Sequence, residues 1–100
     1  MQKSTCCCHK SKHRTEEETT ALIKRLNRIE GQVRGIRQMV ENERYCPDIL
    51  IQSAAATAAL HAFSKVLLSA HIRTCVADDI RNGKDETIDE LLATLGQLMK

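Results

Sequence analysis

Apolar residues recur along this chain with the spacing of helices rather than of strands. Between residues 22 and 40 they follow one another at alternating steps of four and three, with polar residues between them. This stripe consists of Leu22, Leu26, Ile29, Val33, Ile36 and Val40. Steps of four and three sustained over almost three heptads are typical of a helix that packs lengthwise against another helix.

The boundaries of this first helix can be predicted from its flanking residues. Thr15 followed by three glutamates fits a capping box, in which the threonine and Glu18 satisfy each other's backbone N–H groups. The acidic residues also favour the positive end of the helix dipole. Asn42 to Tyr45 is predicted to be a short connection, and Pro47 suits the first turn of the next helix.

The second predicted helix is unusually long. No Pro or Gly occurs between Asp48 and Asn82, and Gly83 provides a stop signal. A helix of about 35 residues exceeds the usual length several-fold, so only a partner can cover its apolar face. A short third helix, from Asp85 to about Met99, is expected to fold back against the end of the second. We therefore expect an all-α fold with two long antiparallel helices and one short helix.

Composition agrees with this fold class. The only aromatic residues are Tyr45 and Phe63, and there is one proline, which suits a helical bundle and argues against a β-sandwich. One hundred residues make one small domain that gains stability from oligomerisation. We expect residues 1–14 to be a flexible arm and residues 15–100 to be the domain. Neither a long apolar run nor a signal peptide is evident, so we expect a cytoplasmic protein without membrane contact, its thiols reduced.

Charge is distributed unevenly. Residues 1–40 carry a net charge of +5 and residues 41–100 a net charge of −3, within a total of +2. A basic half favours an anionic partner, nucleic acid first, although a solvated charged helix face is the alternative. The sequence shows no Ser/His/Asp arrangement and no carboxylate pair for acid–base catalysis, so we do not expect an enzyme.

Two glycines interrupt the basic side of the first helix. Gly31 and Gly35 project with Lys24 and Arg28 opposite the apolar stripe, and three arginines flank that face. These flanking residues are Arg25, Arg34 and Arg37. Each glycine costs about 1 kcal/mol relative to alanine. A bare patch would let a phosphate backbone approach closely, or it would accommodate a neighbouring helix in an oligomer.

Candidate metal chemistry rests on Cys46, His71 and Cys75. His71 and Cys75 lie four residues apart and so share one helix face. Two thiols and an imidazole form a soft ligand set suited to Cu(I) or Zn(II). The alternative is a core histidine with cysteines that serve as small buried hydrophobic residues.

The long second helix separates these candidate ligands. Cys46 precedes His71 by 25 residues, which span roughly 37 Å in a straight helix. An antiparallel helix from a second chain would bring Cys46 of one subunit beside His71 and Cys75 of the other. A twofold axis would then create two such sites per dimer.

Three segments together resemble the copper-sensitive operon repressor family. They are Arg25 to Ile36 (RLNRIEGQVRGI), Tyr45 to Leu50 (YCPDIL) and His71 to Val76 (HIRTCV). The resemblance implies three helices per subunit, an antiparallel dimer and a dimer of dimers. It also implies a transcriptional repressor that binds operator DNA without metal and releases it when an inducer binds.

The resemblance further implies roles for individual residues. Cys46, His71 and Cys75 match the Cu(I) ligands of the family, while Tyr45 and Glu90 match residues that couple the copper site to DNA. Arg25 heads the residues that resemble DNA-contacting positions, together with Lys24, Arg28, Arg34 and Arg37. The complete ligand set favours copper over the nickel, formaldehyde and persulfide branches of the family.

Two alternatives remain at the sequence level. The first is a persulfide- or redox-responsive repressor that links Cys46 to Cys75 and leaves His71 a spectator. The second is a metal-buffering protein without DNA binding. Such a protein would use the N-terminal thiols and imidazole of Cys6, Cys7, Cys8 and His9.

Overall fold

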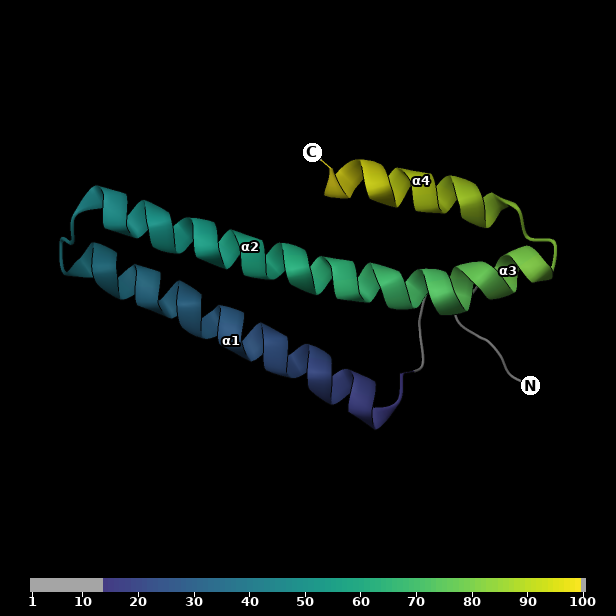
Figure 1. Cartoon of the computed structure of the whole chain (residues 1–100), viewed down its shortest axis with the longest axis horizontal. Coiled ribbons are helices and arrows are strands. Elements are labelled where there is room, and N and C mark those ends of the chain that lie inside the picture. The colour runs from purple at the N-terminus through teal and green to yellow at the C-terminus, as the bar shows by residue number, and fades with distance from the viewer. Residues whose placement is uncertain (1–13, 100) are drawn as a thin grey trace. The chain divides into compact units, whose positions relative to one another are not determined.

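The computed structural model describes residues 14–99, and every regular element within them is helical. Helix α1 spans Glu16–Glu41 and α2 spans Cys46–His71, as Figure 1 shows. A π-helical turn, η2 (Ile72–Val76), and the short α3 (Ala77–Arg81) extend α2, and α4 spans Glu86–Leu98. The predicted all-α fold is confirmed. The four N-terminal candidate ligands and nearly all of the predicted arm lie outside the described residues.

Helix α1 begins as its sequence predicts. The Thr15 backbone N–H donates to Oε1 of Glu18 at 2.9 Å, and the Glu18 N–H donates to Oγ1 of Thr15 at 3.1 Å. Thr15 itself has extended backbone angles, as an N-terminal cap residue requires. Both halves of the capping box are therefore present, and they fix the start of the helix.

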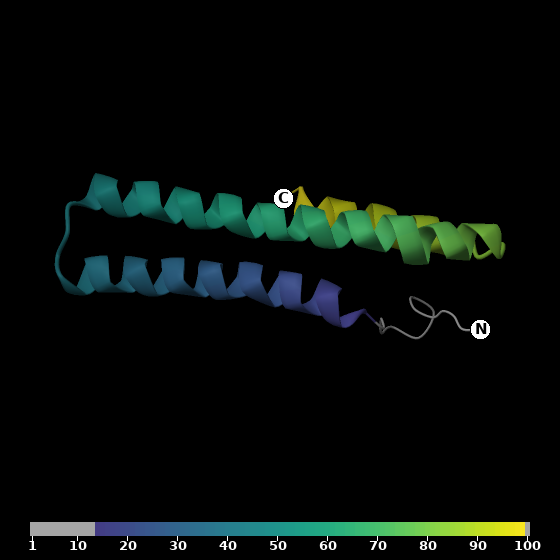
Figure 2. The same cartoon turned by 60° about the horizontal axis from the view of Figure 1, so that its bottom comes forward.

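A four-residue connection joins α1 to α2. Glu43 adopts a left-handed conformation with φ of 54°, and the Arg44 N–H returns to the Met39 carbonyl at 2.9 Å. The Tyr45 carbonyl then accepts from the N–H groups of Asp48 and Ile49, which begins α2 around Pro47. Figure 2 shows α1 and the first part of α2 running in opposite directions from this connection.

Residues 14–67 form one compact unit, the helical hairpin. Ile29 is its only buried residue. Val33 is 54% exposed on α1, while Leu50 and Ile51 are 67% and 63% exposed on α2. The predicted apolar stripe therefore exists, but this chain covers little of it.

Residues 68–99 belong to a second unit, the C-terminal region. Here η2, α3 and α4 pack against one another. Gly83 has φ of 78° just after α3, and the following Lys84 N–H donates to the Asp79 carbonyl at 2.8 Å. This turn reverses the chain, and α4 folds back as predicted.

The C-terminal region holds a buried polar pair. Asp79 and Thr87 are 8% and 6% exposed, and Oγ1 of Thr87 donates to Oδ2 of Asp79 at 2.7 Å. A carboxylate buried without a donor would be strongly destabilising. This hydrogen bond therefore ties α4 to α3 across the turn.

The long second helix differs from its prediction in one respect. Its backbone remains helical from α2 into α3, but Ile72–Val76 is a π-helical turn. No Pro or Gly lies in this turn. Instead, the Thr74 hydroxyl donates to the Ala70 carbonyl at 2.7 Å, a side-chain bond of the kind that bends helices. No helix within residues 14–99 has the length and apolar character to cross a membrane.

Candidate metal centre and basic helix face

Cys46 occupies the first position of α2. Its side chain is exposed, and the neighbouring Tyr45 is 72% exposed. Pro47 and the backbone bonds to the Tyr45 carbonyl fix the start of the helix. Cys46 is thus an accessible thiol on a well-defined backbone.

His71 and Cys75 lie where α2 passes into the π-helical turn. His71 is the last residue of α2 and is half-buried. Cys75 lies in η2 and is the most deeply buried side chain among the described residues, at 1% exposure. A buried thiol one turn from an imidazole is well suited to a soft metal, which binds thiolate sulfur and neutral imidazole nitrogen.

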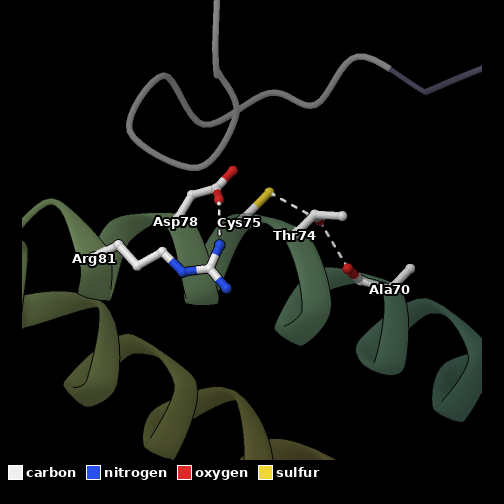
Figure 3. Close-up of polar contacts among 5 residues, drawn as sticks. All are labelled: Ala70, Thr74, Cys75, Asp78 and Arg81. Carbon is white, nitrogen blue, oxygen red and sulfur yellow. Dashed lines mark hydrogen bonds and ion pairs between the residues drawn. The ribbon is translucent and has the colours of Figure 1, made fainter.

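Thr74, which the sequence analysis did not single out, contacts the Cys75 sulfur. Figure 3 shows its hydroxyl between the Ala70 carbonyl and the Cys75 thiol. Its Oγ1 lies 2.7 Å from the carbonyl oxygen and 3.7 Å from Sγ. The sequence feature that could have predicted these contacts is the position of Thr74, four residues after Ala70 and next to Cys75.

An ion pair lies on the same side of the helix as Cys75. Arg81 Nη1 is 3.6 Å from Oδ1 of Asp78, and both side chains are largely exposed (Figure 3). Asp78 follows Cys75 by three residues, so helical spacing places the carboxylate near the thiol. The paired guanidinium offsets the charge of that carboxylate.

The three predicted ligands do not assemble within one chain. Cys46 begins the 26-residue α2 and His71 ends it. Within residues 14–99, no three or more His, Cys, Asp or Glu side chains are grouped so that they could hold a metal ion. Any site that uses all three residues must draw on more than one chain. Glu90 lies on the exposed side of α4.

The five predicted DNA-contacting residues differ in their electrostatic surroundings. All are exposed on α1. Arg34 lies 3.9 Å from Glu30, and Arg37 lies 3.3 Å from Glu41. Lys24, Arg25 and Arg28 form no ion pair with the carboxylates of residues 14–99. The uncompensated positive charge is therefore concentrated in the first half of α1.

The glycines of α1 are not required by packing within the chain. A Cβ atom built on Gly31 would lie 3.8 Å from Nη2 of Arg34, an ordinary contact. A Cβ atom on Gly35 would have no neighbour within 4 Å. Both explanations from the sequence, DNA approach and a helix of another subunit, remain compatible with this geometry.

Comparison with known proteins places these residues in a family. Residues 18–97 match the model of the metal-sensitive transcriptional repressors. The copper-sensing transcriptional repressor CsoR of Bacillus subtilis is 47% identical over 89 residues, 88% of each protein. RicR, a copper-sensing repressor of Mycobacterium tuberculosis, is 36% identical over 91 residues, 88% of this chain and 95% of RicR.

Solved structures agree in fold. The copper-sensing repressor CsoR with Cu(I) from Geobacillus thermodenitrificans superposes with a TM-score of 0.84 at 48% identity. The alignment covers 88% of this chain and 93% of that one. The nickel-responsive regulator InrS superposes with a TM-score of 0.72 at 34% identity, covering 85% and 97% of the two chains. The predicted resemblance is confirmed, and this chain belongs to the family of metal-sensitive transcriptional repressors.

Proposed function

We propose that this protein is a Cu(I)-responsive transcriptional repressor and not an enzyme. It binds operator DNA in its metal-free form and releases the DNA when Cu(I) binds. The observation that carries this proposal is the joint presence of Cys46, His71 and Cys75 in a chain 48% identical to a repressor solved with Cu(I). Two thiolates and an imidazole are donors that Cu(I) prefers.

The proposed copper sites lie between two chains. Because Cys46 and His71 are at opposite ends of α2, each site takes Cys46 from one subunit and His71 with Cys75 from another. The exposed apolar residues of the hairpin supply the surface for that association. A homodimer provides the two chains that each site needs, and two such dimers form a tetramer. We place this protein in the cytoplasm.

The proposed DNA-binding face is on α1. Lys24, Arg25 and Arg28 contribute most, because they form no ion pair with the carboxylates of residues 14–99. Arg34 and Arg37 contribute less, since each must first give up a glutamate partner. These residues contact phosphates and so control affinity more than sequence preference.

Copper acts by differential binding. Ligands can shift a DNA-binding equilibrium only as far as their affinities for the two states differ, about 1–3 kcal/mol in typical allosteric proteins. Cu(I) held by Cys46 of one subunit and by His71 and Cys75 of the other would link the start of α2 in one chain to the end of α2 and to η2 in its partner. Tyr45, beside Cys46, and Glu90, on α4, transmit this change to the DNA-binding face.

The deciding experiment measures copper binding and DNA release in one anaerobic sample. Wild-type protein should bind one Cu(I) per subunit and lose operator affinity as the sites fill. His71→Ala should weaken Cu(I) binding and uncouple it from DNA release, since imidazole is the third ligand. The cysteine variants cannot separate copper from persulfide sensing, because both need the thiols. A wild-type protein that releases DNA with persulfide, or with Ni(II), but not with Cu(I) would contradict the proposal.

Mixing of subunits tests the assembly of the site. Cys46→Ala chains and chains carrying both His71→Ala and Cys75→Ala each lack intact sites as homodimers. Their heterodimers should regain one of the two copper sites, because one subunit contributes Cys46 and the other contributes His71 and Cys75. Heterodimers that form but bind no Cu(I) would exclude sites shared between subunits.

A further inference from the structure

The π-helical turn that carries Cys75 calls for an explanation. Such turns are rare, occur mostly as single turns and are frequent at functional sites. The usual causes of helix distortion, Pro and Gly, are absent from Ile72–Val76. A local feature of this turn is the 2.7 Å hydrogen bond from the Thr74 hydroxyl to the Ala70 carbonyl, a bond of the kind that often bends helices.

The Thr74 hydroxyl lies within hydrogen-bonding distance of the Ala70 carbonyl oxygen and of the Cys75 sulfur. Besides the Ala70 carbonyl oxygen, it lies 3.7 Å from Sγ of Cys75 (Figure 3). A hydroxyl has one proton and can donate it to only one acceptor at a time. While Cys75 is a neutral thiol, the carbonyl oxygen is both nearer and the stronger acceptor.

Metal binding reverses this preference. Cys75 would hold Cu(I) as a thiolate, its S–H proton going to solvent and a sulfur electron pair to the metal. The sulfur then carries negative charge, and hydrogen bonds to charged acceptors are roughly twice as strong as neutral ones. Because Cys75 is 1% exposed, water can hardly supply that hydrogen bond. The Thr74 hydroxyl is next to the sulfur and can.

We propose that Thr74 is a positioning residue of the metal centre, whose hydroxyl donates to the Ala70 carbonyl in the metal-free protein and to the Cys75 sulfur in the loaded protein. The exchange stabilises the bound thiolate and removes the side-chain bond that holds the π-helical turn. Thr74 thereby couples loading of the site to the helix backbone. This inference rests on the proposed function.

The test uses three variants of the full-length protein. Thr74→Val removes the hydroxyl at nearly constant volume, and Thr74→Ser restores it. Thr94→Val is the matched control, since Thr94 is an exposed threonine of α4 in the same region.

Cu(I) affinity is measured anaerobically by competition with a colorimetric Cu(I) chelator. Loss of hydrogen bonds around metal ligands typically costs 10–100-fold in affinity, so Thr74→Val should bind about 10-fold more weakly than Thr94→Val. Thr74→Ser should bind as Thr94→Val does.

A second measurement separates the hydrogen-bond exchange from simple packing. The carbonyl carbon of Ala70, labelled with ¹³C, reports by NMR on whether that oxygen accepts a hydroxyl proton. Its signal should shift when wild-type protein is loaded with Cu(I). In metal-free Thr74→Val it should already be displaced toward the loaded position, and its change on loading should be smaller than in Thr94→Val.

The outcomes are distinguishable. Equal Cu(I) affinity of Thr74→Val and Thr94→Val, or equal losses in Thr74→Val and Thr74→Ser, would overturn the role of the hydroxyl. An Ala70 signal in wild-type protein that is unmoved by loading would overturn it even if Thr74→Val failed to fold. Wild-type protein that binds no Cu(I) would instead overturn the proposed function, and this inference with it.

Discussion

The helical hairpin and the C-terminal region solve the problem of burial in opposite ways. The hairpin, residues 14–67, is the larger unit and carries long apolar stripes, yet it buries only Ile29. The C-terminal region is smaller, yet Cys75, Val76, Asp79 and Thr87 are all buried in it. A segment can therefore be fully helical without burying its apolar side chains. The short elements η2, α3 and α4 bury side chains against one another, whereas the two long helices of the hairpin bury almost none.

This difference also divides the proposed functions. The hairpin presents Cys46 and the basic residues of α1 that form no ion pair within residues 14–99, and in the proposed function both act on a partner molecule. The C-terminal region holds Cys75, the more buried of the two described thiols, in the π-helical turn in which the Thr74 hydroxyl bonds to the Ala70 carbonyl. Under the proposed function, the hairpin would supply the contacts with other chains and DNA, and the C-terminal region would place two of the metal ligands.

The largest effect should come from a charge on the exposed apolar face of α2. Ile51→Asp should convert the assembled protein to smaller species at micromolar concentration, because burying an Ile side chain contributes about 1.5–3 kcal/mol per copy. Analytical ultracentrifugation would measure the change in mass. Gln52→Asp, one residue away with the same charge, is the control and should leave the mass unchanged. An unchanged mass for Ile51→Asp would mean that this part of α2 stays in solvent.

The next effect should come from the polar pair of the C-terminal region. Thr87→Val leaves the buried Asp79 carboxylate without its hydroxyl donor, and an unsatisfied buried group costs about 1–3 kcal/mol. Urea denaturation at fixed protein concentration would measure the loss. Thr87→Ser should recover most of the stability. Equal stability of all three proteins would show that the pair does not hold α4 to α3.

A smaller effect should distinguish the arginines of the hairpin. Arg25→Ala should weaken metal-free DNA binding and reduce the slope of log affinity against log salt by about one unit, since one phosphate contact is lost. Arg34→Ala should change both less, because Arg34 is partly neutralised by Glu30. Fluorescence anisotropy at several salt concentrations measures both. Identical slopes for wild type and Arg25→Ala would remove this end of α1 from the DNA interface.

The smallest effect concerns one glycine in each region. Neither Gly35 nor Gly96 has a neighbour that would meet an added Cβ atom. Alanine at either position should raise the free energy of unfolding by up to about 1 kcal/mol. Gly96→Ala should bind DNA normally, whereas Gly35→Ala should bind it more weakly if phosphates approach that face. A loss of assembly in Gly35→Ala, at unchanged DNA affinity of the remaining oligomer, would assign the glycine to a subunit contact instead.

The sequence predicts the helices well because their signals are local. Thr15 with Glu18, Pro47 and Gly83 each act through neighbouring backbone groups, and the observed boundaries follow them. The π-helical turn was not predictable from periodicity, because the Thr74 hydroxyl acts only once the helix has formed. The pairing of Asp79 with Thr87 depends on how the turn between them folds.

In the candidate site, too, the sequence predicts local features but not those that depend on the folded chain. Residue types and the spacing of His71 and Cys75 indicate soft-metal chemistry, and helix length separates Cys46 from them. Burial could not be predicted from spacing, since Cys46 and Cys75 look alike in sequence but are exposed and buried in the fold. The pairing of Arg34 with Glu30 and of Arg37 with Glu41 was predictable, because each pair is four residues apart on one helix.

The exposed face of α2 also bears on how this protein is made. If the chain associates as proposed, a new copy leaves the exposed Leu50 and Ile51 in water until it meets another, and pairwise encounters rise with the square of chain concentration. Proteases act on chains during that wait, whereas association stabilises them by mass action. Under the proposed assembly, the yield of mature protein would therefore fall more steeply than the rate of its synthesis.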